Sequence, residues 1–245
     1  MSTPNWKNSI LITGAGSGFG AALAHRYAAD GWNVAVTDID KDRAHEICSE
    51  LQDFPGDIFS LKLDITNDEQ WHTAHDTVLE RWGGLQILVN NAGVAASGNI
   101  EDTSMEDWQW VLDIDLMGVV RGCHQFAGLM KQQGSGHIVN ISSFAALAGL
   151  PFIAAYGVAK AGVVALSEAL RAEMHPFGVG VTVACPAFVK TGLLDSFRSP
   201  HADKHRDTLD KVGTWMETSG VSADQVAEDI AKAVVDNKFL LLTHG

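Results

Sequence analysis

Residues 9–20 read SILITGAGSGFG, and this stretch is the most informative about the fold. The apolar run Ser9–Thr13 has the β-favouring character of a buried strand, a glycine-rich turn follows it, and an alanine-rich helical pattern begins at Ala21. Glycines let a backbone turn tightly and approach a pyrophosphate at a helix N-terminus, where free N–H groups and the helix dipole favour negative charge. A strand before the turn and a helix after it are the context that a dinucleotide site requires. The expected cofactor contacts in this turn are Gly14, Ser17, Gly18, Phe19 and Gly20.

Apolar runs alternate with helical patterns along the rest of the chain. Further strands are predicted at residues 33–38, 58–64, 86–91, 137–142, 180–186 and 239–243, and helices at 41–51, 68–81, 106–130, 156–174 and 221–237. Most strands are apolar throughout, which is typical of a parallel sheet covered on both faces. The sequence therefore predicts an α/β fold, a doubly wound Rossmann-type parallel sheet of about seven strands with helices on both faces. No linker or repeat interrupts the pattern, so we expect one domain over residues 1–245.

The composition narrows the possible partners and the compartment. A net charge of -13 argues against binding to the phosphate backbone of nucleic acid. Three scattered cysteines and an N-terminus without an apolar signal segment favour a reduced, cytoplasmic protein. The histidines form neither an HExxH motif nor a cluster with cysteine, so no metal site is expected.

One apolar segment has about the length of a membrane span, at residues 144–166. Pro151 interrupts this segment and Lys160 lies within it. A buried or interface helix therefore explains the segment better than a membrane helix, and we expect no membrane association.

An acidic residue, Asp38, ends the second predicted strand. It lies at the usual distance from the glycine turn for a carboxylate that hydrogen-bonds the adenosine ribose hydroxyls. A 2′-phosphate would meet this negative charge, and neither Ser17 nor Ile39 supplies a cation to offset it. The sequence therefore predicts NAD rather than NADP. The alternative role of Asp38 is that of a helix cap or turn residue.

Four motifs in register resemble those of the short-chain dehydrogenase/reductase family, in its compact single-domain branch. They are TGAGSGFG, NNAG at Asn90–Gly93, ISS at Ile141–Ser143 and YGVAK at Tyr156–Lys160. Their order and spacing match the family along nearly the whole chain. The resemblance implies an NAD(H)-dependent oxidoreductase, an alcohol dehydrogenase or ketone reductase, that interconverts a secondary alcohol and a ketone by hydride transfer.

The resemblance also implies catalytic roles. Tyr156 is expected to be the acid/base at the substrate oxygen, and Lys160, one helical turn later, to lower the Tyr156 pKa and bind the nicotinamide ribose. Ser143 is expected to hold the substrate oxygen, and Ser142 is its less favoured rival. Without the other motifs, Tyr156 and Lys160 would be interpreted as polar tips on a core helix. The further cofactor contacts implied are Asp64, Ile65, Asn91, Ala92, Gly93, Val189 and Thr191.

The chain departs from the family pattern at Asp115, where relatives usually carry asparagine. That asparagine is associated with a helix kink and with a water that links the lysine to solvent. An ionised aspartate cannot donate a hydrogen bond, and it brings a carboxylate near Lys160. We therefore expect Asp115 to take part in a functional proton relay with a shifted pH optimum. Ala187 also replaces a usual glycine after the sixth strand.

The segment 192–220 has no strand pattern and follows the implied nicotinamide contacts, so we expect it to form a substrate lid. An apolar pocket is predicted from Leu193, Leu194, Phe197, Trp215 and Met216 with Val94, Ala145, Phe152 and Phe188. The expected substrate is an alcohol or ketone with an apolar body. A basic cluster in the lid is interpreted as solvated surface rather than an anion site: His201, Lys204, His205 and Arg206.

Relatives pack the helices equivalent to 107–130 and 156–174 between subunits, so we expect a homodimer or homotetramer. Many relatives continue beyond the last strand, which favours a more open pocket here or one completed by a neighbouring subunit. Two other functions stay possible at this point. One is a dinucleotide-binding sensor or scaffold with weak or no catalysis, and the other, less favoured, is an epimerase or dehydratase.

Overall fold

The computed structural model describes residues 5–187, residue 198 and residues 221–243. These residues form one parallel sheet of seven strands in the order β3-β2-β1-β4-β5-β6-β7. The strands are β1 Ser9–Thr13, β2 Asn33–Asp38, β3 Ile58–Lys62, β4 Ile87–Asn90, β5 Gly136–Ile141, β6 Val179–Cys185 and β7 Leu240–Leu242. The predicted doubly wound α/β sheet is confirmed. Several strands end one or two residues earlier than predicted.

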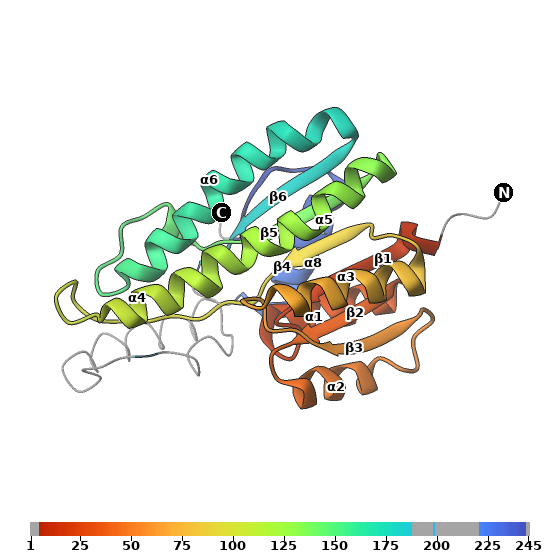
Figure 1. The fold of residues 1–245 in the computed structure, drawn as a ribbon, viewed down its shortest axis with the longest axis horizontal. Helices are drawn as coiled ribbons and strands as arrows, with labels where there is room; N and C mark the ends of the chain where they lie inside the picture. Colours follow the sequence, from red (N-terminus) through yellow and green to blue (C-terminus); the bar gives the residue numbers. More distant parts are fainter. Residues whose placement is uncertain (1–4, 188–197, 199–220, 244–245) are drawn as a thin grey trace.

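The helices cover both faces of the sheet (Figure 1). Their bounds are α1 Gly18–Ala29, α2 Lys41–Glu50, α3 Asp68–Trp82, α4 Met105–Leu112, α5 Val119–Gln133, α6 Ala154–Met174 and α8 Ala223–Val235. Because side chains alternate along a strand, Ile10 and Ile12 pack with α1 and α8, whereas Leu11 packs on the opposite face with α3, α5 and α6. The strands are therefore apolar on both faces, as a buried parallel sheet requires.

The strand order reverses between β1 and β4, which lie side by side at the centre of the sheet. In a doubly wound sheet the crevice outside the carboxyl ends of the strands at this reversal is the usual ligand site. The glycine turn follows β1 and the NNAG motif follows β4. The topology therefore brings these two motifs, 70 or more residues apart, to one edge of the sheet.

The predicted helix over residues 106–130 is not uniform. A π-helical segment, η2 Asp113–Gly118, separates α4 from α5. π-Helical turns are rare and are frequently found at functional sites. Asp115 lies in this segment and is buried. The helical periodicity of the sequence was correct for the helix as a whole, but it did not predict this wider turn.

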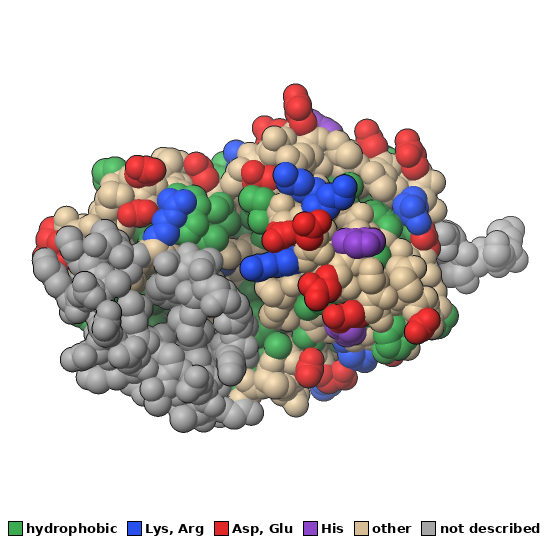
Figure 2. Space-filling model, turned by 90° about the horizontal axis from the view of Figure 1, so that it is seen from below, with side chains coloured by type: hydrophobic (Ala, Val, Ile, Leu, Met, Phe, Trp, Pro, Cys, Tyr) green, Lys and Arg blue, Asp and Glu red, His purple; other side chains and the backbone are tan. Residues whose placement is uncertain are grey.

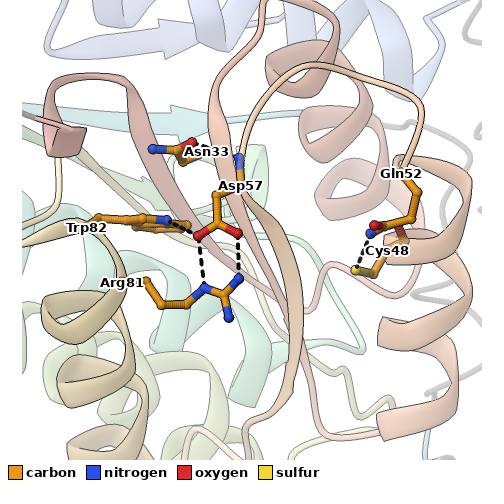
Figure 3. Close-up of polar contacts among 6 residues, drawn as sticks. All are labelled: Asn33, Cys48, Gln52, Asp57, Arg81 and Trp82. Carbon is orange, nitrogen blue, oxygen red and sulfur yellow. Dashed lines mark hydrogen bonds and ion pairs between the residues drawn. The ribbon is translucent and has the colours of Figure 1, made fainter.

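A polar cluster at the opposite end of the sheet joins the start of β3 to α3 (Figure 3). The Arg81 guanidinium donates Nε–H to Asp57 Oδ2 at 2.9 Å, and the Trp82 indole donates to the same oxygen at 2.9 Å. The Asn33 side chain accepts the Asp57 N–H at 2.8 Å. Hydrogen bonding from Arg81 holds the pKa of Asp57 below its usual value. This cluster fixes the connection between α2 and β3, and no residue in it belongs to the predicted site.

None of the helices in the described ranges combines the length and hydropathy needed to span a bilayer. The apolar segment 144–166 is divided between a short 3-10 helix, η3 Phe144–Ala146, and the first part of α6. Figure 2 shows acidic side chains scattered among basic ones over the face drawn, rather than gathered in one block. One local ion pair joins Arg26 to Asp30 at the end of α1.

A buried histidine makes the stability of this fold sensitive to acid. Thr182 Oγ1 donates its single hydrogen to the Lys238 carbonyl oxygen at 2.7 Å. The same hydroxyl oxygen can therefore only accept a hydrogen bond from His137 Nε2, which lies 2.7 Å away. Burial lowers the pKa of His137 from its usual value of 6.5 to about 4. Between pH 6.5 and about pH 4, the His137 imidazole is therefore protonated in the unfolded chain but neutral in the folded chain. Stability falls as pH falls through this range.

We expect His137→Gln to reduce this pH dependence. Wild type should lose about 2 kcal/mol of unfolding free energy through His137 between pH 7 and pH 5, and the variant should lack this part. Urea unfolding at both pH values measures it. The exposed His124, changed to glutamine, is the matched control and should keep the wild-type dependence. Equal pH dependence in His137→Gln and wild type would contradict the prediction.

Candidate active site

The glycine turn after β1 is held against the NNAG segment after β4. Gly14 has φ +61°, and a Cβ there would lie 2.8 Å from the Ala92 Cα atom. The Asn91 side-chain amide donates to the carbonyl oxygens of Thr13 and Gly14 at 2.8 and 3.1 Å. Thr13 Oγ1 in turn accepts the backbone N–H groups of Asn91 and Ala92. The Asn91 side chain thus shapes the turn itself, a contact that the sequence motifs did not predict.

The N-terminus of α1 opens from the same turn. Ser17 is its N-cap residue, and the Ser17 hydroxyl makes no capping hydrogen bond. Gly18 has φ +54°, and a Cβ on Gly20 would lie 2.3 Å from the Gly14 carbonyl oxygen. The Phe19 side chain packs on the core under α1. The result is a close backbone cradle at a helix N-terminus, and this geometry fits the pyrophosphate of a dinucleotide.

Asp38 lies directly beside this cradle at the end of β2. Its Oδ2 atom accepts the Gly16 N–H at 3.0 Å, and its Oδ1 atom accepts the Asp40 N–H at 2.9 Å. A Cβ on Gly16 would lie 2.9 Å from Asp38 Oδ2, so a glycine is needed at this approach. The N-cap of α2 is Asp40 rather than Asp38, since Asp40 accepts the N–H groups of Asp42 and Arg43. Asp38 therefore has a turn contact but is not a helix cap.

Asp64 and Ile65 lie just beyond β3. Asp64 Oδ1 accepts the backbone N–H and the hydroxyl of Thr66 at 2.9 and 2.7 Å. The Ile65 side chain is buried against Gly118, where an added Cβ would meet Ile65 Cδ1 at 2.4 Å. The structure thus places this pair next to η2, at the same edge of the sheet as the glycine turn.

Tyr156 and Lys160 lie one turn apart on α6 and are both buried, with 9% and 3% of their surface exposed. The Lys160 Nζ atom is 5.5 Å from the centre of the Tyr156 ring. It donates to the Ile141 carbonyl oxygen at 3.3 Å and forms an ion pair with Asp115 Oδ2 at 3.0 Å. The side chains are therefore not solvated tips, because buried polar groups of this kind need the partners that they have here.

The two candidate serines have different contacts. Ser142 Oγ donates to the Lys160 carbonyl oxygen at 2.8 Å, which anchors α6 to the end of β5. Ser143 Oγ accepts the Ala145 N–H at 3.2 Å, and the Ser143 side chain is close enough to Tyr156 to act on the pKa of its phenol. Of the two, Ser143 is the one that faces the phenol.

Burial and charge shift the pKa values of this cluster. Burial raises the pKa of Tyr156, Lys160 acts in the opposite direction, and Asp115 adds to the increase, so the pKa lies above its usual value. Burial alone would lower the pKa of Lys160, but the nearby Asp115 and Tyr156 together raise it, which keeps the lysine charged. Burial raises the pKa of the Asp115 carboxyl, against the effect of Lys160.

Some predicted residues fall outside the described part of the chain. These are Val189, Thr191, Phe188 and the lid segment 192–220 except Arg198, whose backbone pairs with Ala96. Of the predicted pocket residues that the structure does describe, Val94 and Ala145 pack in one apolar cluster with Tyr156. Phe152 lies in the loop before α6 with φ +67°, and its carbonyl oxygen accepts the Gly98 N–H. In the described ranges, no three or more His, Cys, Asp or Glu side chains gather as metal ligands.

Comparison with known proteins agrees with this geometry. The sequence matches the family model for short chain dehydrogenase over residues 8–202. A "Probable oxidoreductase EphD" of Mycobacterium tuberculosis is 34% identical over 94% of this chain, which spans only 40% of that relative's length. A "3-alpha-(or 20-beta)-hydroxysteroid dehydrogenase" of the same species is 36% identical over 76% of this chain and 70% of its own.

Short-chain dehydrogenases of known structure also resemble this chain. A short chain dehydrogenase/reductase from Burkholderia phymatum in complex with NAD superimposes with a TM-score of 0.89 at 30% identity, covering 99% of this chain and 91% of that one. A short-chain dehydrogenase from Sphingobium yanoikuyae in complex with NADPH gives a TM-score of 0.79 at 25% identity, covering 96% and 86%. These similarities and the shared fold show that this chain belongs to the short-chain dehydrogenase family of oxidoreductases.

Proposed function

We propose that this protein is an NAD(H)-dependent oxidoreductase that interconverts a secondary alcohol and a ketone, with Tyr156 as the acid/base. The observation that carries the proposal is that Tyr156 and Lys160 are buried together on α6, with the half-buried Ser143 beside Tyr156, at the edge of the sheet where the glycine turn lies. The test is the change in NADH absorbance with a panel of secondary alcohols and ketones. No turnover across the panel would contradict the proposal.

The residues of the cradle fit a nicotinamide dinucleotide, which supplies or accepts the hydride when bound. Gly14, Ser17, Gly18, Phe19 and Gly20 would hold its pyrophosphate through backbone N–H groups, and Asp38 would bind the adenosine ribose. Asp64, Ile65, Asn91, Ala92 and Gly93 would line the adenine side. Lys160 has a further N–H donor beyond those used by Asp115 and Ile141, which suits the nicotinamide ribose. Val189 and Thr191 are proposed contacts of the carboxamide.

The reacting oxygen would lie between Ser143 and Tyr156. In reduction, Tyr156 Oη gives its proton to the carbonyl oxygen as the hydride arrives at the carbon, and in oxidation the phenolate takes the alcohol proton. The Ser143 hydroxyl holds that oxygen in place and shares its developing charge. Lys160 stabilises the phenolate by its positive charge.

The proposed substrate has an apolar body. Val94, Ala145 and Tyr156 pack in one apolar cluster beside the site, which supports this choice. The hydroxysteroid after which one relative is named is also largely apolar. We further propose that residues 1–245 act as one domain in which residues 192–220 form a lid, and that a homodimer or homotetramer forms in the cytoplasm.

We expect NAD to be preferred over NADP because Asp38, which accepts the Gly16 N–H, would bind the adenosine ribose and repel a 2′-phosphate. Changing Asp38 to serine should lower kcat/KM with NAD about ten- to a hundredfold, by loss of a charged hydrogen bond, and reduce the preference over NADP. Initial rates with both cofactors measure this. The exposed Asp53, changed to asparagine, is the control for net charge and should behave as wild type. A wild-type preference for NADP would overturn the assignment.

The second candidate function is a dinucleotide-binding sensor or scaffold with little catalysis. The specific observation in its favour is the ion pair between Asp115 and Lys160, since it neutralises the charge that would activate Tyr156. A protein of this kind would bind NADH, detected by quenching of tryptophan fluorescence, and would turn over none of the alcohols or ketones in the panel.

A further inference from the structure

Asp115 holds the most completely buried charge in the described part of the active site. No part of its surface is exposed. Its Oδ1 atom accepts the Val94 N–H at 2.7 Å, directly after the NNAG motif, and its Oδ2 atom lies 3.0 Å from Lys160 Nζ. The carboxylate thus connects three separate elements of the site: the π-helical segment η2, the segment after β4, and α6.

The surrounding atoms keep this ion pair in place. A Cβ on Gly93 would lie 3.2 Å from Lys160 Nζ and 3.3 Å from Asp115 Oδ2, so the backbone of Gly93 closes one side of the pair. The Ile141 carbonyl oxygen holds the same ammonium group at 3.3 Å. These contacts hold the Lys160 ammonium group beside Asp115.

We propose that Asp115 is a positioning residue that biases this site toward carbonyl reduction at neutral pH, by keeping the proton on Tyr156 through its ion pair with Lys160. This inference rests on the proposed function, in which Tyr156 is the acid/base. The sequence predicted only that Asp115 takes part in a proton relay. The proposal adds that Asp115 favours reduction over oxidation at neutral pH.

The stability of the Tyr156 phenolate depends on whether Lys160 acts alone or is paired with Asp115. With Lys160 alone, one positive charge near the phenol stabilises the phenolate and favours loss of its proton. With Asp115 at 3.0 Å from the ammonium, the pair is neutral overall and the phenolate gains much less. In the described residues, the other polar groups that act on Tyr156 are Ser143 at the start of η3 and Cys185 at the end of β6. Neither of these carries a charge in its ordinary state near neutral pH, so neither replaces the lost attraction.

The two directions of the reaction use opposite states of Tyr156. Reduction breaks the Tyr156 O–H bond and forms the alcohol O–H bond, while the hydride from the reduced cofactor forms the new C–H bond. Oxidation needs the phenolate to accept the alcohol proton while the hydride leaves to the oxidised cofactor. A phenol that keeps its proton is therefore ready for reduction at neutral pH, whereas oxidation gains rate only as the pH rises.

The chain allows a direct titration of Tyr156 without cofactor, because it has only two tyrosines. Burial raises the pKa of the other one, Tyr27, far above its usual value. The tyrosinate absorbance of wild type minus that of Tyr156→Phe therefore reports Tyr156. In wild type this phenol should titrate above the usual value of 10. A midpoint below 10 would overturn the inference, and this measurement needs no change at Asp115.

Asp115→Asn keeps the size and the acceptor for the Val94 N–H but removes the charge. We expect the Tyr156 midpoint to fall by about one pH unit or more in this variant, and the rising limb of the pH profile for alcohol oxidation to move in the same direction. The matched control is Asp113→Asn, which removes a charge from the same π-helical segment at a residue that contacts Gln109. Its titration and its pH profile should match wild type.

The outcomes separate this inference from the proposed function. If Tyr156→Phe retains full turnover, the acid/base role itself is wrong. If Tyr156→Phe is inactive but Asp115→Asn has the wild-type titration and pH profile, only the role of Asp115 is overturned. A shifted profile with an unchanged Tyr156 midpoint also overturns it, since Asp115 would then act by a route other than the phenol.

Discussion

Replacing Tyr156 with phenylalanine is expected to reduce kcat by a factor of about 10² to 10⁴ while leaving the fold and the cofactor affinity nearly unchanged. The two rings have the same shape, so the buried position on α6 stays filled. Only the hydroxyl beside Ser143 is lost, and with it the proton that the reacting oxygen needs. The rate is measured by NADH absorbance, and binding is measured by quenching of tryptophan fluorescence.

The control for this change is Tyr27→Phe. Tyr27 is the other tyrosine of the chain, is also buried, and packs edge-on against Trp32 in the core on the other side of the sheet. This variant should have wild-type kcat. Similar losses in the two variants would show that removing a buried phenol damages the fold in general, and would remove the support for Tyr156 as the acid/base.

Replacing Lys160 with methionine is expected to cost about 3–5 kcal/mol of unfolding free energy at pH 7. The change leaves the Asp115 carboxylate fully buried without its counter-charge, and it should abolish turnover as well. In the variant the carboxyl should bind its proton more tightly when folded than when unfolded. A folded-state pKa that is raised above the unfolded value makes stability fall as pH rises. The stability deficit of the variant relative to wild type should therefore be smaller at pH 5 than at pH 7, since His137 destabilises both proteins alike at pH 5.

Two further variants make this prediction specific to the buried pair. Removing both charges, as Asp115→Asn with Lys160→Met, should restore most of the lost stability without restoring activity. Lys232→Met breaks an exposed ion pair with Asp236 at 2.7 Å and should have no measurable effect on stability. Urea unfolding at both pH values measures all three. A single Lys160→Met variant as stable as wild type would mean that Asp115 is not charged in the folded protein.

Much of the fold was predictable because its signals are local in the sequence. The strand, glycine turn and helix of residues 9–29 occur in direct succession, and the apolar strands alternate with helices to the end of the chain. The order of the strands then follows from parallel pairing and right-handed crossovers. Likewise, the spacing of Tyr156 and Lys160 is one helical turn, so their shared face could be predicted before any contact was known.

The sequence was less informative where the outcome depends on packing. The helical pattern of residues 106–130 did not predict the π-helical turn of η2, because periodicity reports the buried face and not the width of a single turn. The Asn91 amide and the Thr13 hydroxyl support the glycine turn by contacts between strands, which no spacing rule predicts. The sequence showed an unusual aspartate at position 115, but it did not predict that this carboxylate lies 3.0 Å from the Lys160 ammonium group.

The amino-acid sequence was sufficient to predict the doubly wound sheet and the glycine turn between its first strand and first helix, because these follow from periodicity and turn chemistry within short segments. It was not sufficient to predict that Asp115 and Lys160 are buried together at 3.0 Å, with Val94 and Ile141 as their backbone partners. The physical reason is that Coulomb energy depends on distance and on exclusion of water. Residues 45 positions apart in the chain acquire both properties only when η2 and α6 pack together.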